Sequence, residues 1–263
     1  MDVREPLLIA QEPNTWYTGF DPIDITPIDP GQQAILQWRF NAVGITIDGP
    51  AIIANGGEPR VLSLVESRIR NGELTIKDAL GVGLFSSGTN VKMMDGLGEA
   101  VNNGNIYAGL NRATQTFWNP GAFYTTSAEP TFAFIQQQLI GPTTQGNTKP
   151  NLAFTTQNIW NKLWAQALPQ QRPENTDEAT MGWDFLKIGS MRIYVDSHVP
   201  VGFFYVLNTE FVKIFVHEDY DFISTEWMPS LGQDAHTMRI HWAGNLILNN
   251  PRFTGVATAL VET

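Results

Sequence analysis

Asp196 and His198 are the first candidates for chemistry in this sequence. A carboxylate and an imidazole two residues apart share one face of a strand, where they could bind a metal ion together. No third ligand lies at a telling spacing, however, and Pro200 follows directly. An aspartate that caps a turn is the favoured interpretation, because Asp hydrogen-bonds backbone groups two residues on. The sequence therefore predicts no metal site here.

The other histidines also lack the spacing of a catalytic or metal-binding motif. His217 begins an acidic cluster that continues to Asp221, but the cluster has neither HExxH nor EF-hand spacing. A solvated strand end is favoured for it. His236 and His241 are five residues apart, which places them on opposite faces of a strand. We do not expect them to share a ligand.

Glycine motifs give no stronger indication of catalysis. Gly96 and Gly98 are followed by Glu99, without the third glycine of a dinucleotide fingerprint and without an evident strand before them. The chain has no phosphate-binding GxxxxGK[ST] segment and no GxSxG segment. Two carboxylates that meet only in the folded chain would leave no local pattern. We therefore predict no catalytic, cofactor-binding or metal-binding residues, and a protein that is not an enzyme.

The composition is poor in charge and rich in aromatic residues. Charged residues make up 16% of the 263, and there are 8 Trp and 15 Phe, whereas an ordinary soluble domain is about 25% charged. Depletion of charge with enrichment of aromatics is typical of the core of a protein–protein interface. A monomer with a neutral polar surface fits the composition equally well.

The net charge of −10 argues against direct binding of nucleic acid, because phosphate contacts need clustered Lys and Arg. A container for nucleic acid is still compatible with it, since a container's wall should not stick to its contents. The chain has no Cys, so it has no disulfide or thiolate site, which suits assembly in a reducing cytosol. No signal peptide is visible, and no apolar stretch is long enough to span a membrane.

The first 35 residues do not have the sequence pattern of a globular domain. They contain five Pro and three neighbouring aromatic residues, Trp16, Tyr17 and Phe20, without a helical period. Alternating apolar residues over Asp21–Thr26 indicate an extended hairpin, which would bury little surface alone. We expect this arm to contact another chain, with the three aromatic residues as anchors. The alternative is a strand pair on the chain's own sheet.

A strand and a long helix follow the arm. Ala34–Ile47 alternates like a strand, and the alternation changes parity near Ala42, which predicts a bend or bulge there. Pro59 marks the first turn of a helix that should end near Phe85. Its apolar stripe is expected at five positions, which are Leu62, Val65, Ile69, Ile76 and Leu80.

The rest of the chain mixes helices with strands, so the expected fold class is α+β. Helices are predicted over Ala128–Ile140 and Gln157–Leu168, with a strand at Leu152–Phe154 before the second. Further strands are predicted over Met191–Val195, Gly202–Leu207, Val212–His217, Met238–Ile247 and Gly255–Val261.

Four segments, in order along nearly the whole chain, resemble segments of tailed-bacteriophage major capsid proteins. They are Gly96–Val101 with Tyr107–Arg112 and Phe117-Trp118, Pro150–Thr156 with Trp160 in the next helix, Met191–Leu207, and Gly244–Thr258. The resemblance implies the Hong Kong 97 coat fold, with an extended loop, a peripheral domain that holds a long spine helix, and an axial domain with a central sheet flanked by helices. We place the extended loop at 1–40, the peripheral domain at 41–86 plus 210–263 with the spine helix at 58–85, and the axial domain at 87–209.

Two departures from the family pattern stand out. The family has an arm before the extended loop, and this chain starts almost inside the loop, so we expect the arm to be short or missing. Some relatives cross-link through a Lys in the loop, and the first Lys here is Lys77, so that chemistry is expected to be absent.

The resemblance implies a virion protein that self-assembles in the host cytoplasm into an icosahedral head enclosing double-stranded DNA. Its partners would be copies of itself in pentamers and hexamers, with scaffold, portal and decoration proteins, and no sequence-specific contact with DNA and no membrane. Two alternatives stay open: an encapsulin-like shell, and a Trp-rich β-sheet carbohydrate-binding module or hydrolase. A module of that kind would leave the long helix and the extended start unexplained.

Overall fold

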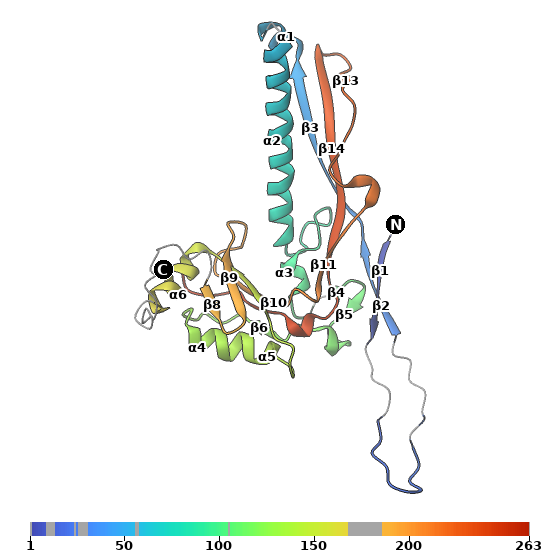
Figure 1. The fold of residues 1–263 in the computed structure, drawn as a ribbon, viewed down its shortest axis with the longest axis vertical. Coiled ribbons are helices and arrows are strands. Elements are labelled where there is room, and N and C mark those ends of the chain that lie inside the picture. The colour runs from blue at the N-terminus through green and yellow to red at the C-terminus, as the bar shows by residue number, and fades with distance from the viewer. Residues whose placement is uncertain are drawn as a thin grey trace.

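The structure is a computed structural model that describes residues 2–8, 14–23, 25, 31–55, 58–104, 106–167 and 186–262. Figure 1 shows three parts of very different shape: a long stem, a lobe beside its lower end, and a hairpin that projects away from both. The stem contains α1, α2, β3 and β11 to β14, and the lobe contains β6 to β10, β15 and α4 to α6.

The stem is a five-stranded antiparallel sheet with a long helix packed along it. Ten residue pairs join β3 to β14, from Ala235↔Asp48 to Gly244↔Arg39. The elements of the stem are β3 (Arg39–Asp48), α1 (Gly49–Ala54), α2 (Glu58–Leu84), β11 (Val212–Val216), β12 (Ile223–Ser224), β13 (Met228–Pro229) and β14 (Ala235–Leu248), with a 3₁₀ turn at Glu218–Tyr220.

Helix α2 confirms the predicted spine helix, ending one residue before the expected Phe85. Its inner face is built on Gly72 and Ile76, both buried. A Cβ on Gly72 would lie 2.7 Å from Cδ1 of Ile45 on β3, so the missing side chain lets helix and sheet approach closely. The predicted stripe was wrong at Leu62, which is 57% exposed, whereas Ile69 and Ile76, seven and fourteen residues further on, pack in the core.

The bend predicted near Ala42 lies instead at Trp38, between β2 and β3. Ala34 and Leu36 are buried before it, and Ile45 and Ile47 after it. The buried positions therefore change from even to odd numbers, as the sequence predicted. The residues after Trp38 alternate too weakly between polar and apolar to show where the strand is interrupted.

Within the described residues, the lobe is a mixed six-stranded sheet in the order β6-β15-β10-β7-β9-β8. Its core includes Ile159 and Leu163 of α6 and Phe204 of β10, all fully buried. The elements of the lobe are β6 (Ala122–Tyr124), α4 (Phe132–Phe134), a π-helical turn (Ile135–Ile140), α5 (Gly141–Thr143), β7 (Leu152–Thr155), α6 (Gln157–Ala167), β8 (Leu186–Ile188), β9 (Met191–Val195), β10 (Phe204–Leu207), a 3₁₀ turn (Pro251–Phe253) and β15 (Gly255–Ala257).

Several boundaries in the lobe differ from the prediction: β10 begins at Phe204 and not at Gly202, and β15 ends at Ala257 and not at Val261. The helical run expected at Ala128–Ile140 starts at Phe132, because the Thr131 side chain caps it by accepting a hydrogen bond from Phe134 N. The span 210–263 was expected in the peripheral domain, but β15 pairs with β10 and, in parallel, with β6. The chain end therefore closes the sheet of the lobe, and this pairing depends on long-range contacts that no local pattern reveals.

A junction of short elements connects stem and lobe, namely α3 (Leu97–Ala100), β4 (Ile106–Tyr107), β5 (Leu110–Asn111) and a 3₁₀ turn at Thr116–Trp118. The projecting hairpin pairs β1 (Asp2–Leu8) with β2 (Gly31–Gln37) in antiparallel register. Beyond these strands the hairpin extends into a loop tip, residues 14–23 and 25, that lies far from the stem and the lobe (Figure 1). The alternating segment predicted over 21–26 lies partly outside the described residues.

Candidate intersubunit contact site

The three aromatic residues predicted as anchors lie together on the loop tip and are uncovered. Trp16 is 95% exposed, Tyr17 60% and Phe20 107%. The alternative, in which they pack against their own chain, does not hold for the described residues. Single exposed hydrophobic residues are ordinary, but a contiguous apolar patch usually marks an interaction site.

The tip is closed by a local turn. The Asp21 carboxylate accepts hydrogen bonds from Thr18 N at 3.0 Å and from Thr18 Oγ1 at 3.1 Å, and Asp21 N donates to Thr18 O at 3.3 Å. Gly19 supplies the positive φ of 61° that the turn needs. The turn therefore presents its aromatic side chains outward without any support from the rest of the described chain.

The base of the hairpin, in contrast, is fixed to the stem and the junction. Glu5 Oε1 accepts from Lys213 Nζ of β11 at 2.6 Å and from Asn249 Nδ2 at 2.9 Å. Ile35 N donates to Ala108 O of the junction at 2.9 Å. The hairpin therefore projects from a fixed base, which sets the direction in which the tip reaches.

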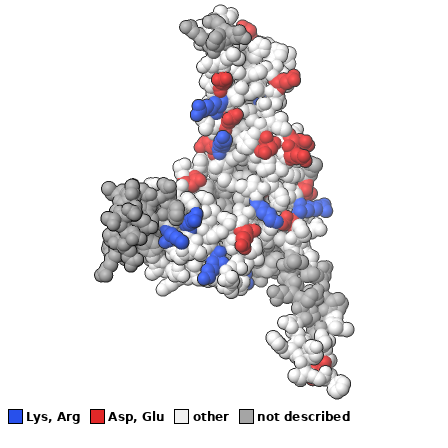
Figure 2. Space-filling view, in the orientation of Figure 1, with Lys and Arg blue, Asp and Glu red and all other residues white. Residues whose placement is uncertain are grey.

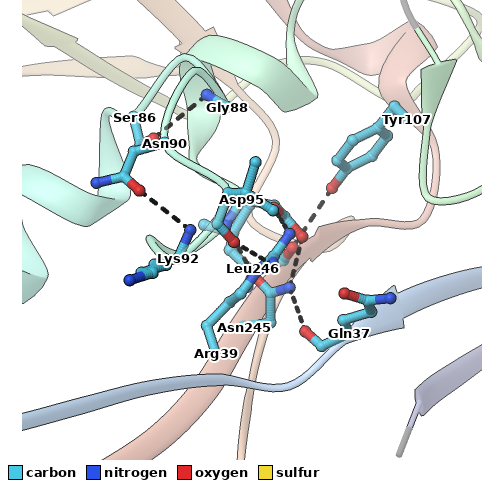
Figure 3. Close-up of polar contacts among 11 residues, drawn as sticks. Gln37, Arg39, Ser86, Gly88, Asn90, Lys92, Asp95, Tyr107, Asn245 and Leu246 are labelled. Carbon is cyan, nitrogen blue, oxygen red and sulfur yellow. Dashed lines mark hydrogen bonds and ion pairs between the residues drawn. The ribbon is translucent and has the colours of Figure 1, made fainter.

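A buried polar cluster holds the end of α2 to the sheet (Figure 3). Asp95 N donates to Asn245 Oδ1 at 2.9 Å, and Asn245 Nδ2 returns a hydrogen bond to Asp95 Oδ2 at 2.7 Å. Asn245 Nδ2 also reaches Gln37 O at 2.9 Å, and Arg39 binds the other Asp95 oxygen at 2.8 Å. The cluster thus connects β2, β3, β14 and the segment after α2. It was not predicted, because its members are up to 208 residues apart in sequence.

The segment Gly96–Trp118, which carried part of the family resemblance, proves to be structural. Arg112 is fully buried and donates to Trp118 O at 3.1 Å, Glu99 O at 2.9 Å and Ala100 O at 2.5 Å. Its guanidinium also lies 4.9 Å from the centre of the Tyr107 ring, which stacks on Trp118. Burial lowers the pKa of Arg112 to about 10, so the side chain keeps its charge at neutral pH and ties the junction together.

Gly96 and Gly98 sit against the carboxyl end of α2. A Cβ on Gly96 would lie 2.4 Å from Gly83 O and 2.5 Å from Ser86 N, and one on Gly98 would lie 2.9 Å from Ser86 O. No nucleotide fingerprint is present. Glycine is required here because two backbones touch. The half-buried Glu99 beside them has its pKa raised by desolvation and by the Asp95 charge.

His198 and Asp196 do form the predicted turn. Asp196 Oδ1 accepts from His198 N at 2.9 Å and contacts His198 Nδ1 at 2.8 Å. The other ring nitrogen, Nε2, lies 2.9 Å from Asp78 Oδ1 on α2, so the imidazole bridges lobe and stem. Hydrogen bonds to Asp78 and Asp196 raise the pKa of His198. Among the described residues no group of three His, Asp or Glu side chains could hold a metal ion.

His236 and His241 both lie on β14, and His217 precedes the 3₁₀ turn, where its Nδ1 accepts a hydrogen bond from Asp219 N at 3.2 Å. The rings of His217 and His241 each lie edge-on to Tyr220. Both rings therefore belong to an aromatic cluster around Tyr220. His217 directly follows β11, which agrees with the strand end predicted from the sequence.

Comparison with known proteins identifies the fold through structure alone. No family model and no curated protein matches the sequence. The chain is similar to the cyanophage A-1(L) capsid, with 13% identity, a TM-score of 0.68, and coverage of 98% of this chain and 88% of that chain. It is similar to the cyanophage Pam1 capsid, at 16% identity and a TM-score of 0.55, with 98% and 85% covered. It is also similar to the SrpI encapsulin of Synechococcus elongatus PCC 7942, at 11% identity and a TM-score of 0.62, with 90% and 78% covered.

The stem, lobe and projecting hairpin therefore form a shell-protein fold shared by phage capsids and an encapsulin. This shared fold is the mixed helix-and-sheet Hong Kong 97 fold, as the sequence resemblance implied. A β-sheet carbohydrate-binding module would have neither the 27-residue α2 nor this match over nearly the whole chain.

Proposed function

We propose that this chain is the major capsid protein of a tailed phage, which self-assembles into an icosahedral head around double-stranded DNA. The observation that carries the proposal is the combination of a fixed projecting hairpin, a stem and a lobe in one chain, matched over 98% of its length by a phage capsid subunit. The solved structures to which the chain is similar are phage capsid and encapsulin shells, which supports a structural role. Its role is structural, and it is not an enzyme.

Assembly would proceed through heterologous contacts between identical subunits, which close into rings of five and six. Trp16, Tyr17 and Phe20 would anchor each loop tip on the next subunit, since buried aromatic residues tend to dominate interface energy. Each contact can be weak, because many contacts per subunit act together. Scaffold, portal and decoration proteins would be the further partners in the virion.

In this proposal the stem is the peripheral domain and the lobe is the axial domain that meets its neighbours at ring centres. The residues 255–257 then belong with the axial domain, which extends the assignment 87–209 by β15. Residues 1–40 remain the extended loop, with its base at β1 and β2.

The charge distribution supports a shell whose inner surface does not bind DNA tightly. Figure 2 shows acidic and basic side chains interspersed over the stem, without an extended basic patch on the face in view. With a net charge of −10 the subunit would contact DNA without sequence specificity and without tight binding. None of the described helices is long and apolar enough to cross a membrane. The proposed location is the virion shell, after assembly in the host cytoplasm.

Electron microscopy of the purified chain over a series of concentrations and salt levels tests the proposal. We expect closed shells, tubes or hexagonal sheets. A uniform population of small monomers or dimers under every condition, including with crowding agents, would contradict self-assembly.

A second function, an encapsulin-like compartment that encloses proteins, is favoured by the similarity to the SrpI encapsulin. The two functions differ in what the shell contains. Mass spectrometry of shells purified from the native host distinguishes them: packaged DNA supports the phage head, and a co-purifying cargo protein without DNA supports the compartment.

A further inference from the structure

One imidazole joins the loop after β9 to helix α2. His198 Nδ1 lies 2.8 Å from Asp196 Oδ1 in its own turn, and His198 Nε2 lies 2.9 Å from Asp78 Oδ1 on α2. The ring also lies against bare helix, because a Cβ on Gly81 would be 2.7 Å from His198 Cε1. Figure 1 shows the β9 end of the lobe beside the lower end of α2. The imidazole therefore holds the lobe to the stem about two helical turns before α2 ends.

Both contacts are hydrogen bonds only when the ring is protonated. A neutral imidazole has one N–H donor and one nitrogen that only accepts, and an ionised carboxylate also only accepts. The charged groups that act on the ring are Asp78 on α2 and Asp196 on the turn, and hydrogen bonds to both raise the pKa of His198. Gly81, the third contact, brings no charge. The bridge is therefore complete only while His198 carries both of its protons.

The neutral ring would give up Asp78 and keep Asp196. Asp196 Oδ1 also accepts from His198 N at 2.9 Å, so the turn holds this carboxylate beside Nδ1 in either state of the ring. The Asp78 side chain is 75% exposed and comes from the other part of the molecule. A neutral ring with its proton on Nδ1 would present a lone pair to Asp78, and the contact between lobe and stem would become repulsive.

The joint between stem and lobe is loosely packed near this bridge. A hollow of about 400 Å³ lies between Phe85 at the end of α2 and Pro200 and Phe203 of the lobe. Close packing resists displacement, whereas a hollow leaves room for the two sides to shift. The titratable group in its lining, Tyr205, keeps its proton because burial raises its pKa. The packing therefore permits a change of angle at Phe85, and His198 is the group there that titrates near neutral pH.

We propose that Asp78, Asp196 and His198 form a proton-operated latch between the lobe and the stem. With the ring protonated, the latch holds the lobe at one angle to α2. With the ring neutral, the contact to Asp78 is lost and the lobe turns about the joint at Phe85. The latch is closed below the ordinary pKa of histidine and opens as the pH rises through the raised pKa.

The latch is a property of the subunit, and only its consequence for shells rests on the proposed function. One fixed angle gives all subunits one shape, whereas a free angle allows several curvatures. Shells should therefore be more uniform in diameter when the latch is closed.

Energy transfer between two dyes measures the angle in the unassembled subunit, because the chain contains no Cys of its own. Ser63→Cys on α2 and Lys187→Cys on β8 place the dyes at exposed positions in the stem and in the lobe. The transfer efficiency should be constant at acidic pH and should change as the pH rises through the raised pKa of His198. A constant efficiency between about pH 5 and about pH 9, a range that contains the titration of histidine, would overturn the latch.

Three variants, each made in the dye-labelled chain, separate the proton from the fold. Asp78→Asn should keep the latch closed at every pH, because an amide N–H can donate to Nε2 of the neutral ring. Gly81→Ala should open it at every pH, since the added Cβ displaces the ring while alanine favours the helix. His236→Gln removes an exposed histidine on β14 and is the matched control, which should titrate like the unaltered chain. A pH response that survives Asp78→Asn or disappears with His236→Gln would contradict the latch.

Electron microscopy of shells assembled at both ends of the pH range tests the consequence for assembly. Shells of the unaltered chain should vary more in diameter at the higher pH, and shells of Asp78→Asn should not. Equal variation in the unaltered chain at both pH values would overturn the effect on shells. Failure of the unaltered chain to form shells would refute the proposed function, whereas the energy transfer in the free subunit decides the latch independently.

Discussion

Gly96→Ala should destabilise the folded subunit strongly, for a reason that is purely steric. The residue has φ −84° and ψ −176°, a backbone conformation that alanine adopts without strain. The added Cβ, however, would lie 2.4 Å from Gly83 O, 2.5 Å from Ser86 N and 2.8 Å from Leu84 O. These are backbone atoms at the end of α2, so relief requires the helix end to move.

Overpacking of a well-packed site costs about 1–3 kcal/mol, and we expect a loss of about 3 kcal/mol because no flexible side chain can give way. Gly44→Ala is the matched control, since its Cβ would meet nothing within 4 Å. Replacing a strand glycine by alanine at an open position should be neutral or should stabilise by about 0.5 kcal/mol. Urea unfolding of the unassembled subunit, followed by circular dichroism, measures both free energies. Equal midpoints for Gly96→Ala and the unaltered chain would refute the steric argument.

Three further predictions concern the tip, the bridge and the chain end. The double variant Trp16→Ala/Phe20→Ala should leave the urea midpoint of the subunit unchanged, because both side chains are exposed. It should nevertheless reduce the yield of shells seen by electron microscopy. A normal yield would contradict the role of these residues as anchors. His198→Gln should cost stability most at pH below 6.5, the ordinary pKa of histidine. The difference from the unaltered chain should vanish as the pH rises through the raised pKa, and a difference that grows with pH would contradict the bridge. For Glu262, burial would raise the carboxyl pKa, but hydrogen bonds from Thr156, Gly202 and Asn158 outweigh it and lower the pKa. Glu262→Gln should therefore destabilise the lobe above pH 4.5, and this loss of stability should fade as the pH falls through the lowered pKa. Thermal melts at a series of pH values measure the loss. A loss that stays constant on acidification would contradict the role of these hydrogen bonds.

The parts of the fold with a strong local signal were predictable. Helix α2 has proline in its first turn and a regular apolar period, and β9 matched its predicted bounds Met191–Val195. The exposed aromatic tip could also be predicted, because a proline-rich segment with three neighbouring aromatic residues has no core of its own to bury them in.

What the sequence could not supply was long-range pairing. Asp95 and Asn245 hold each other across 150 residues, and β15 joins β6 in parallel at the far edge of the lobe sheet. Nothing in the residues around Arg112 in the sequence shows that three backbone carbonyls converge on its side chain. Such contacts are defined only once distant segments are packed together.

The unpaired edge of β3 affects how the free subunit behaves before it meets its partners. Among the described residues β3 (Arg39–Asp48) pairs with β14 alone, and the eight residues between Arg39 and Asp48 carry neither charge nor proline. Its other edge is therefore a template on which other extended chains can stack. At high expression the subunit should be prone to insoluble aggregates whenever shell formation is slower than synthesis. Solubility should then improve with conditions that speed shell closure, and a charged residue placed on this edge should keep the subunit soluble.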